Sequence, residues 1–243
     1  MNFVLIHGGF HGGGCWRLVA QRLRAQGHHV THPTQTGLGE RRHLASNDLT
    51  LEVFIQDVVN HLVYEDLADV VLVGHSFGGI AISGAAERVP ERIGQLVYLD
   101  SLIVQPGQTP YDTLPPEVMA QRRKGFEVVD GVRGFAPPAP SVFGVPDDHP
   151  QAAWVRSRLT PQPESLYDSA LPIKGPVGNG LPRTYIACTA PVIPAVVGSQ
   201  AWARQQPGWG WQELATGHDA MITAPEALAD MLVSIGRASK IRD

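Results

Sequence analysis

Short apolar segments alternate along the chain with longer amphipathic ones, and this alternation predicts the fold. Strands are predicted at residues 3–6, 28–34, 69–73, 95–99, 183–188 and 209–214. Helices are predicted at residues 16–25, 50–64, 80–86, 199–206 and 225–235. Strands that alternate with helices are typical of a parallel sheet with helices on both faces. The pattern therefore predicts an α/β protein.

The alternation stops between residues 103 and 182. Prolines are frequent there, and only short helical pieces are predicted, at residues 117–124 and 151–159. The stretch also carries the aromatic residues Tyr111, Phe126, Phe135, Phe143, Trp154 and Tyr167. We expect residues 103–182 to form an irregular cap over a pocket, inserted into a core made of residues 1–102 and 183–243. A surface excursion with a small core of its own is the alternative.

A candidate nucleophile lies in the middle of the chain. The apolar strand 69–73 leads directly into Gly74-His75-Ser76-Phe77-Gly78, and a helix of small residues follows. Strand, G-x-S-x-G turn and helix together form a nucleophile elbow, in which a strained turn lifts the serine hydroxyl above the sheet. Glycines are needed two positions before and after Ser76, because a Cβ atom there would collide with neighbouring backbone. An ordinary strand–helix turn is the alternative interpretation.

Two further segments fit a serine hydrolase. The first strand ends in His7-Gly8-Gly9-Phe10, where backbone N–H groups can face a developing oxyanion without side chains in the way; a plain flexible loop is the alternative. Near the other end of the chain, Gly217-His218 forms a turn between the last strand and the last helix. A histidine at this place predicts the general base, in the chain order serine, acid, histidine.

The carboxylate that completes the triad is predicted to be Asp100. It ends the strand 95–99, which follows the elbow helix and should therefore lie beside the strand of Ser76 in a parallel sheet. The carboxyl ends of both strands would then meet at one edge. Asp219 is a weaker rival because it is adjacent to His218, and Glu213 is a more remote one. A purely structural role for Asp100 at the exit of its strand is the remaining alternative.

Composition excludes several classes of function. The 243 residues carry a net charge of −4 with no basic patch, so nucleic acid is not an expected partner. No apolar run approaches the ~20 residues of a membrane span, and the first strand begins directly after Asn2, so we expect a cytoplasmic protein. Two cysteines cannot form a disulfide framework. No cofactor motif is present, and no metal is expected, since the histidines at positions 28, 29, 32 and 43 lack ligand spacing. A homodimer is left open.

Several stretches together resemble a known family. They are FVLIHGGFHGGGCW (3–16), LVGHSFGG (72–79), YIACT (185–189) and GHDAM (217–221), with RLTPQP (158–163) in the expected cap. The chain resembles α/β-hydrolases of the group that contains plant hydroxynitrile lyases, methyl salicylate esterases and bacterial esterases. This resemblance implies a mostly parallel, doubly wound sheet with an inserted cap, Ser76 as nucleophile and His218 as base.

The resemblance also implies backbone donors and substrate contacts. The N–H groups of Gly9 and Phe77 would form the oxyanion hole, with Gly8 or Phe10 as the alternative to Gly9 if the register shifts by one residue. His11, Trp154 and Met221 are expected to contact the substrate. These last three positions lie in the matching stretches or in the expected cap.

Two departures from the family pattern bear on function. Asp219 stands where the plant lyases have a lysine that holds the leaving cyanide, and residues 189–194 contain no carboxylate where the family's acid usually lies. We therefore expect a serine carboxylic ester hydrolase that acts on small apolar or aromatic esters through an acyl-enzyme. A hydroxynitrile lyase and a non-catalytic protein that binds a small ligand are the alternatives.

Overall fold

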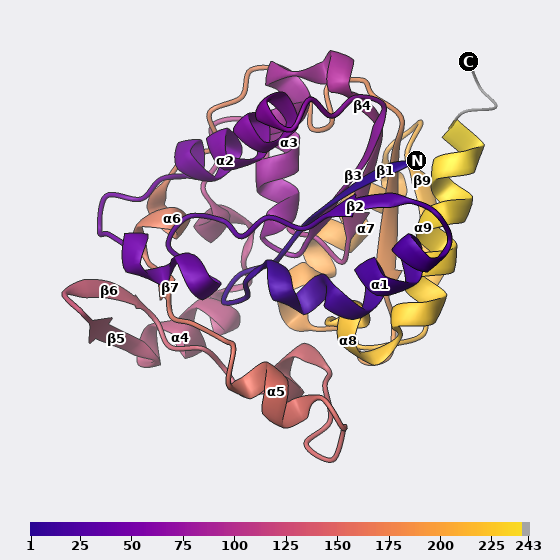
Figure 1. Ribbon diagram of the computed structural model, residues 1–243. Helices are drawn as coiled ribbons and strands as arrows, with labels where there is room; N and C mark the ends of the chain where they lie inside the picture. Colours follow the sequence, from indigo (N-terminus) through magenta and orange to yellow (C-terminus); the bar gives the residue numbers. More distant parts are fainter. Residues whose placement is uncertain (240–243) are drawn as a thin grey trace.

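A six-stranded parallel sheet forms the centre of the computed structural model, which describes residues 1–239 (Figure 1). Its strands lie in the order β2-β1-β3-β4-β8-β9, and every neighbouring pair is parallel. They are β1 (Asn2–Ile6), β2 (His29–Thr31), β3 (Val70–His75), β4 (Ile93–Leu99), β8 (Arg183–Cys188) and β9 (Gly210–Leu214). The predicted α/β fold is confirmed, although β2 is shorter than the predicted strand 28–34.

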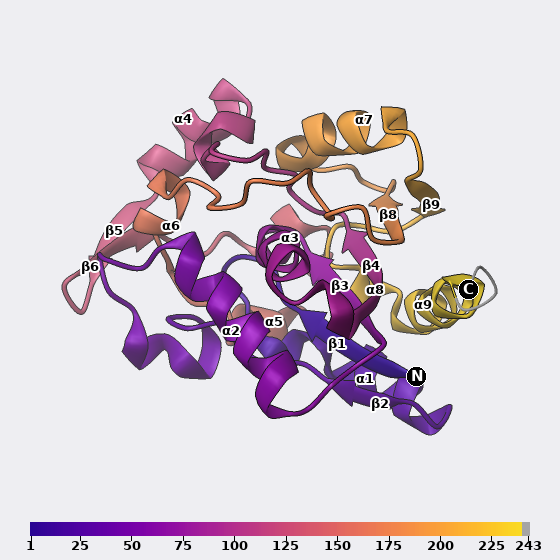
Figure 2. The ribbon, with the colours of Figure 1, turned by 90° about the horizontal axis from the view of Figure 1, so that it is seen from above.

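Helices cover both faces of this sheet (Figure 2). The helices α2 (Leu51–Tyr64), α3 (Gly78–Arg88) and α7 (Val197–Gln205) pack on one face, and α1 (Arg17–Ala25) and α9 (Pro225–Ser239) pack on the other. In β1, Val4 and Ile6 belong to the first apolar cluster, whereas Phe3 and Leu5 belong to the second. Because both faces are buried, the strands are apolar throughout rather than alternating.

Short helices complete the core. They are the 3-10 helices η1 (Gly13–Trp16), η2 (Gly39–Leu44), η3 (Pro90–Arg92) and η6 (Pro194–Val196), and the single-turn helix α8 (Ala220–Thr223). Helix α9 continues four residues beyond the predicted end at 235. Among residues 1–239, no helix combines the length and the apolar character that crossing a bilayer requires.

Residues 103–182 contain more regular structure than the sequence suggested. Between β4 and β8 lie η4 (Pro110–Thr113), α4 (Pro116–Lys124), η5 (Pro140–Phe143), α5 (Ala152–Arg156) and α6 (Ser165–Asp168). The strands β5 (Phe126–Val129), β6 (Val132–Phe135) and β7 (Gln162–Pro163) form a second, antiparallel sheet. In Figure 1, α4, α5, β5 and β6 lie outside the main sheet.

The expectation of an irregular segment was therefore wrong for β5 and β6. They form a hairpin whose turn residues Asp130 and Gly131 both have positive φ, 56° and 79°. Positive φ at both central positions is the requirement of a type I′ turn, and Asp-Gly is a preferred sequence for it. This dipeptide was the local signal for the hairpin.

The turn between β3 and α3 is strained and tightly packed. Ser76 has a φ of 52°, a left-handed conformation that costs about 1–3 kcal/mol in a residue other than glycine. Neighbouring backbone holds it there, because Ser76 N donates to Leu99 O at 3.0 Å and Ser76 O accepts from Leu102 N at 3.1 Å. At Gly78, a Cβ atom would lie 2.6 Å from His7 O, so β1 itself requires glycine at this position.

The packing of Gly78 gives a direct test of the elbow. We expect Gly78→Ala to lower the free energy of unfolding by about 1–3 kcal/mol, because the new methyl group overlaps the backbone at the end of β1. Gly14→Ala is the matched control, since nothing lies within 4 Å of a Cβ atom built there, and its effect should stay within about 0.5 kcal/mol. Urea unfolding measures both values, and equal stability of the two variants would contradict the packing argument.

Candidate active site

The carboxyl edge of the sheet brings together a histidine and a buried carboxylate. Nδ1 of His218 lies 2.7 Å from Oδ2 of Asp100, and the two side chains are 2% and 0% exposed. The other carboxylate oxygen of Asp100 accepts hydrogen bonds from the backbone N–H of Cys188 at 3.1 Å and from Nε2 of Gln200 at 2.7 Å. The carboxylate is thus held by three donors from three different segments, which satisfies a buried charge.

The rival carboxylates lie elsewhere. Oδ2 of Asp219 pairs with Nε2 of His11 at 3.0 Å. Glu213 is exposed on β9, where it accepts from Nε1 of Trp211. Asp100 is therefore the carboxylate in contact with the imidazole of His218, as the strand order predicted. Its catalytic role stays a prediction.

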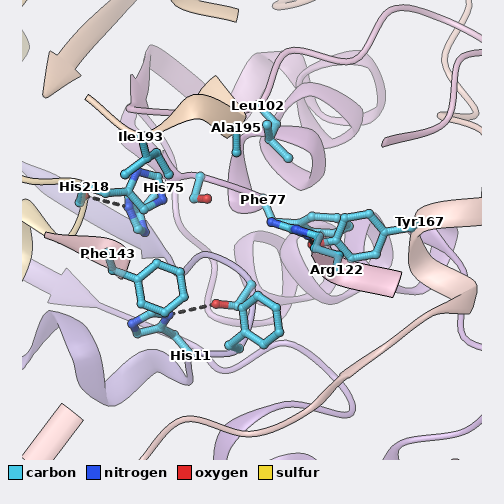
Figure 3. Close-up of a pocket in the computed structure, with 13 residues that line it drawn as sticks. His11, His75, Phe77, Leu102, Arg122, Phe143, Tyr167, Ile193, Ala195 and His218 are labelled. Atoms are coloured by element: carbon cyan, nitrogen blue, oxygen red, sulfur yellow. Dashed lines mark hydrogen bonds between the residues drawn. The ribbon is translucent and has the colours of Figure 1, made fainter. Parts of the chain in front are cut away.

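Ser76 and His218 line the same small chamber, together with Gly9, His11, Phe77 and Phe143. We call it the serine chamber; its volume is about 20 Å³, which is room for about one water molecule. Figure 3 shows His218, Phe143 and His11 on one side of it. Among the described residues, no hydrogen bond joins Ser76 Oγ to His218. A loose serine–histidine contact is common in enzymes without bound substrate.

Backbone N–H groups approach the serine chamber from two sides. Phe77 stands at the start of α3, where the first N–H groups have no acceptor within the helix and carry its positive dipole end. Gly9 lines the chamber from the end of β1. The N–H of Phe10 instead donates to Oε1 of Gln162 at 3.0 Å, so this donor already has an acceptor. Of Gly8, Gly9 and Phe10, the three registers that the sequence left open, Phe10 is the one whose N–H is engaged in this bond.

Comparisons with known proteins agree with this geometry. A model of the alpha/beta hydrolase family matches residues 3–231. The chain belongs to the α/β-hydrolase family. A carbendazim hydrolyzing esterase of Nocardioides sp. (strain SG-4G) is 38% identical, over 97% of this chain and 99% of the relative.

Two further relatives extend the comparison. Methylesterase 10 of Arabidopsis thaliana is 27% identical, over 96% of this chain and 91% of that protein. The crystal structure of a pyrethroid hydrolase from Sphingobium faniae JZ-2 superimposes with a TM-score of 0.78 at 26% identity, covering 98% of both chains. The resemblance to α/β-hydrolases and methylesterases that the sequence motifs indicated is confirmed.

Two of the three expected substrate contacts in this α/β-hydrolase are not supported. Trp154 lies outside the serine chamber, in a separate cavity, where the guanidinium of Arg17 stacks 3.7 Å from its ring. Met221 is fully buried in the apolar cluster beneath α1 and α9, because the turn after His218 directs it into the core. His11 does line the chamber, but both of its ring nitrogens are occupied by protein acceptors.

A second, larger cavity adjoins the serine chamber of this hydrolase. We call it the cap cavity; its volume is about 640 Å³ and its walls are largely apolar. It shares Phe10, Arg122, Phe143, Ile193 and Ala195 with the serine chamber. Of the aromatic residues in segment 103–182, Phe135 and Phe143 line the cap cavity. Aromatic residues of this segment were expected to line a pocket.

Arg122 lines both cavities, and no sequence motif pointed to it. Its guanidinium lies 5.0 Å from the ring centroid of Tyr167 and donates to the hydroxyl of that residue. Figure 3 shows the two side chains together at the edge of the serine chamber. Within residues 1–239, no carboxylate forms an ion pair with Arg122. A cationic donor in a mostly apolar wall is therefore available to a ligand.

His75, the residue before the serine, also has a structural task that the motif did not reveal. Its Nε2 donates to the backbone carbonyl of His218 at 3.0 Å, and the two rings lie 4.5 Å apart. Burial, together with the nearby His218 and His11, holds the pKa of His75 well below its usual range, so the ring is neutral. His75 thereby fixes the loop that carries His218.

Several histidines surround the site, and each has a hydrogen-bond partner of its own. In the described part of the chain, no three His, Cys, Asp or Glu side chains gather in a way that could hold a metal ion. The rings of His7, His11 and His75 are instead bonded to backbone carbonyls, and that of His218 is bonded to Asp100. His7 donates from Nδ1 to Gly8 O at 2.8 Å and accepts at Nε2 from Gln35 N at 3.0 Å, which defines a neutral ring.

The neutral state of His7 predicts that the folded protein loses stability in acid. Burial lowers the pKa of His7 to about 4, whereas the unfolded chain protonates it near 6.5. Its contribution to stability is therefore complete above pH 6.5 and is lost as the pH falls toward 4. That contribution is about 3 kcal/mol, at 1.36 kcal/mol per pKa unit. We expect His7→Asn, which keeps a donor toward Gly8 O, to lose less stability over this range than the wild type does. Urea unfolding at pH 6.5 and pH 4 compares the two chains, and parallel losses would contradict the assignment.

Proposed function

We propose that the protein is a serine carboxylic ester hydrolase that acts on small apolar or aromatic esters through an acyl-enzyme. The observation that carries the proposal is the buried pair of His218 and Asp100, 2.7 Å apart, beside a serine in the strained turn between β3 and α3. Three relatives support the same reaction class: their names are carbendazim hydrolyzing esterase, methylesterase and pyrethroid hydrolase.

In this proposal His218 transfers a proton in each of two half-reactions, acylation and deacylation. Nε2 of His218 takes the hydroxyl proton of Ser76 as Oγ attacks the ester carbonyl, and then gives it to the leaving alcohol. A water molecule repeats the cycle and releases the acid. Asp100 accepts from Nδ1–H, which keeps the tautomer with its lone pair on Nε2 and stabilises the imidazolium.

The oxyanion of the tetrahedral intermediate would be held by backbone. Gly9 and Phe77, whose N–H groups are the proposed donors, both line the serine chamber, one in the loop after β1 and the other at the start of α3. Fixed donors of this kind are worth roughly 3–4 kcal/mol each in acyl transfer. The bond from Phe10 N–H to Gln162 favours Gly9 over Phe10 as the first donor.

Residues 103–182 would act as a cap in this enzyme. The segment supplies Arg122, Phe135 and Phe143 to the walls of the cap cavity, while Ile193 and Ala195 come from the core after β8. The walls are mainly apolar, and the volume of about 640 Å³ suits a compact ligand. An aromatic acid or alcohol group fits this environment better than a long flexible chain.

The lyase alternative is disfavoured by the position of Asp219. This residue replaces the lysine of the plant lyases, is fully buried, and is bonded to His11 rather than directed into the serine chamber. A carboxylate at this position cannot stabilise a leaving cyanide ion, because both groups are negatively charged. Hydrolysis of an aryl methyl ester without cleavage of mandelonitrile would separate the two activities.

Substitution of the triad tests the proposed function. Ser76→Ala is expected to reduce ester hydrolysis by several orders of magnitude, and Asp100→Asn by up to ~10⁴, because the amide favours the wrong tautomer of His218. A Ser76→Ala, His218→Ala double variant should be no worse than either single variant, since the two residues act as one unit. Steady-state kinetics and labelling with a fluorophosphonate measure these effects. A Ser76→Ala enzyme with a tenth of the wild-type kcat would refute the proposal.

The position of Arg122 in the cavity wall predicts a preference for esters that carry an additional hydrogen-bond acceptor. A hydrogen bond to a charged donor is worth about 1.5–3 kcal/mol, or roughly 10–100-fold in kcat/KM. We expect Arg122→Leu to lower kcat/KM by that factor for methyl 4-acetylbenzoate, whose acetyl oxygen can accept, and by less for the similarly shaped methyl 4-isopropylbenzoate. Arg123→Leu, at the exposed neighbouring position on α4, is the control. An equal loss on both esters would show that Arg122 does not recognise the acceptor.

A further inference from the structure

We infer that the buried ion pair of His11 and Asp219 positions the oxyanion hole, by fixing the peptide unit that follows Gly9. The inference rests on the proposed function, since it concerns the same tetrahedral intermediate. His11 and Asp219 belong to the positioning apparatus and make no contact with the reacting atoms.

The bonding of His11 determines its charge. Nε2 lies 3.0 Å from the carboxylate oxygen Oδ2 of Asp219, and Nδ1 lies 2.8 Å from the carbonyl oxygen of Gly9. Both partners are acceptors only, so both ring nitrogens must carry a proton. A neutral ring would turn a lone pair toward one of the two oxygens. His11 is therefore an imidazolium paired with a carboxylate.

The surroundings of His11 are consistent with this charge. Burial disfavours the imidazolium, but the charge and the hydrogen bond of Asp219, with the bond to Gly9 O, raise the pKa of His11 above its usual value. The two nearby histidines, His7 and His75, have lowered pKa values because of burial, so they are neutral and do not compete for the carboxylate. The pair is 4% and 0% exposed, and such a charge is held in place by its partner.

The peptide units on both sides of Gly9 are clamped. The unit between Gly9 and Phe10 is held at its oxygen by His11 and at its N–H by Oε1 of Gln162. The unit between Gly8 and Gly9 is held at its oxygen by Nδ1 of His7. The N–H of Gly9 belongs to this second unit. Its direction is therefore set by His7, which holds the oxygen of that unit, and by His11 and Gln162, which hold the unit that follows. A Cβ atom at Gly9 would lie 2.1 Å from Oε1 of Gln162, so glycine allows the Gln162 side chain to approach this peptide closely.

The ion pair also links the two halves of the site. Asp219 follows His218 directly, and its own backbone N–H donates to Phe143 O at 2.9 Å. The bond from Asp219 to His11 therefore ties the loop of the general base to the loop of the oxyanion donor. A displacement of either loop by about 1 Å is enough to cost about 10²-fold in rate, because the donors must meet the oxyanion rather than the ground-state carbonyl.

A pair of double variants tests the positioning role. His11→Leu with Asp219→Leu removes both charges, and so leaves no buried ion unpaired, but it loses the donor to Gly9 O. We expect kcat to fall about 10²-fold while KM changes less than threefold, because the loss is confined to the transition state. His11→Asn with Asp219→Asn should recover most of this kcat, since the asparagine amide can donate in place of Nδ1–H. The inhibition constant of an aryl trifluoromethyl ketone should follow kcat in both variants.

The control removes a different buried polar pair. Oγ of Ser83 on α3 and the hydroxyl of Tyr98 on β4 lie 3.0 Å apart, and neither residue lines the serine chamber. Ser83→Ala with Tyr98→Phe should leave kcat within threefold of wild type. A leucine double variant that folds and keeps kcat within threefold would overturn the inference. Persistence of hydrolysis in Ser76→Ala, measured in the same assay, would instead overturn the proposed function.

A measurement on the unsubstituted protein covers the case in which the leucine variant does not fold. Nitrogen-15 spectra of the histidine rings at pH 7 should show one buried histidine with protons on both nitrogens, and this signal should be absent from the asparagine double variant. A neutral His11 at pH 7 would overturn the inference, because one of its two bonds could not then form.

Discussion

The carboxylate of Asp100 is the group on which the catalytic end of this molecule depends. A fully buried charge is tolerated only where donors surround it, and here they come from the turn after β9, the end of β8 and α7. Each of these bonds fixes one segment relative to β4. The carboxylate therefore assembles the active-site edge of the sheet and, in the proposed reaction, orients the base.

A second histidine–carboxylate pair repeats this arrangement with a different outcome. His218 presents one nitrogen to Asp100 and keeps the other free of protein acceptors among the described residues, whereas both nitrogens of His11 are engaged. The first ring can therefore exchange a proton, and the second can only hold backbone in place. In the proposed function, two pairs of the same residue types thus take different roles, because the second nitrogen of His11 is bonded to the carbonyl of Gly9.

In the proposed function, the cap cavity would add selectivity to the hydrolysis of esters. Its walls are mainly apolar, so burial of a small aromatic group supplies most of the binding free energy. Arg122 is a partly buried cation in this wall, and its contact with Tyr167 keeps the guanidinium in place. In the proposed function, a neutral substrate with one acceptor group is compatible with both features.

Local patterns in the sequence determined the parallel sheet, the Ser76 turn and the turn of His218. The position of Asp100 also followed, because consecutive strands of a parallel sheet end at the same edge. Asp130-Gly131 was a usable local signal for the hairpin of β5 and β6. Only the tertiary structure decided that Phe10 N–H is bonded to Gln162, that Trp154 and Met221 lie away from the serine chamber, and that Arg122 lines it. The pairing of His11 with Asp219 joins residues 208 positions apart. No periodicity or spacing encodes such a contact, since it depends on how the loops at the sheet edge pack against each other.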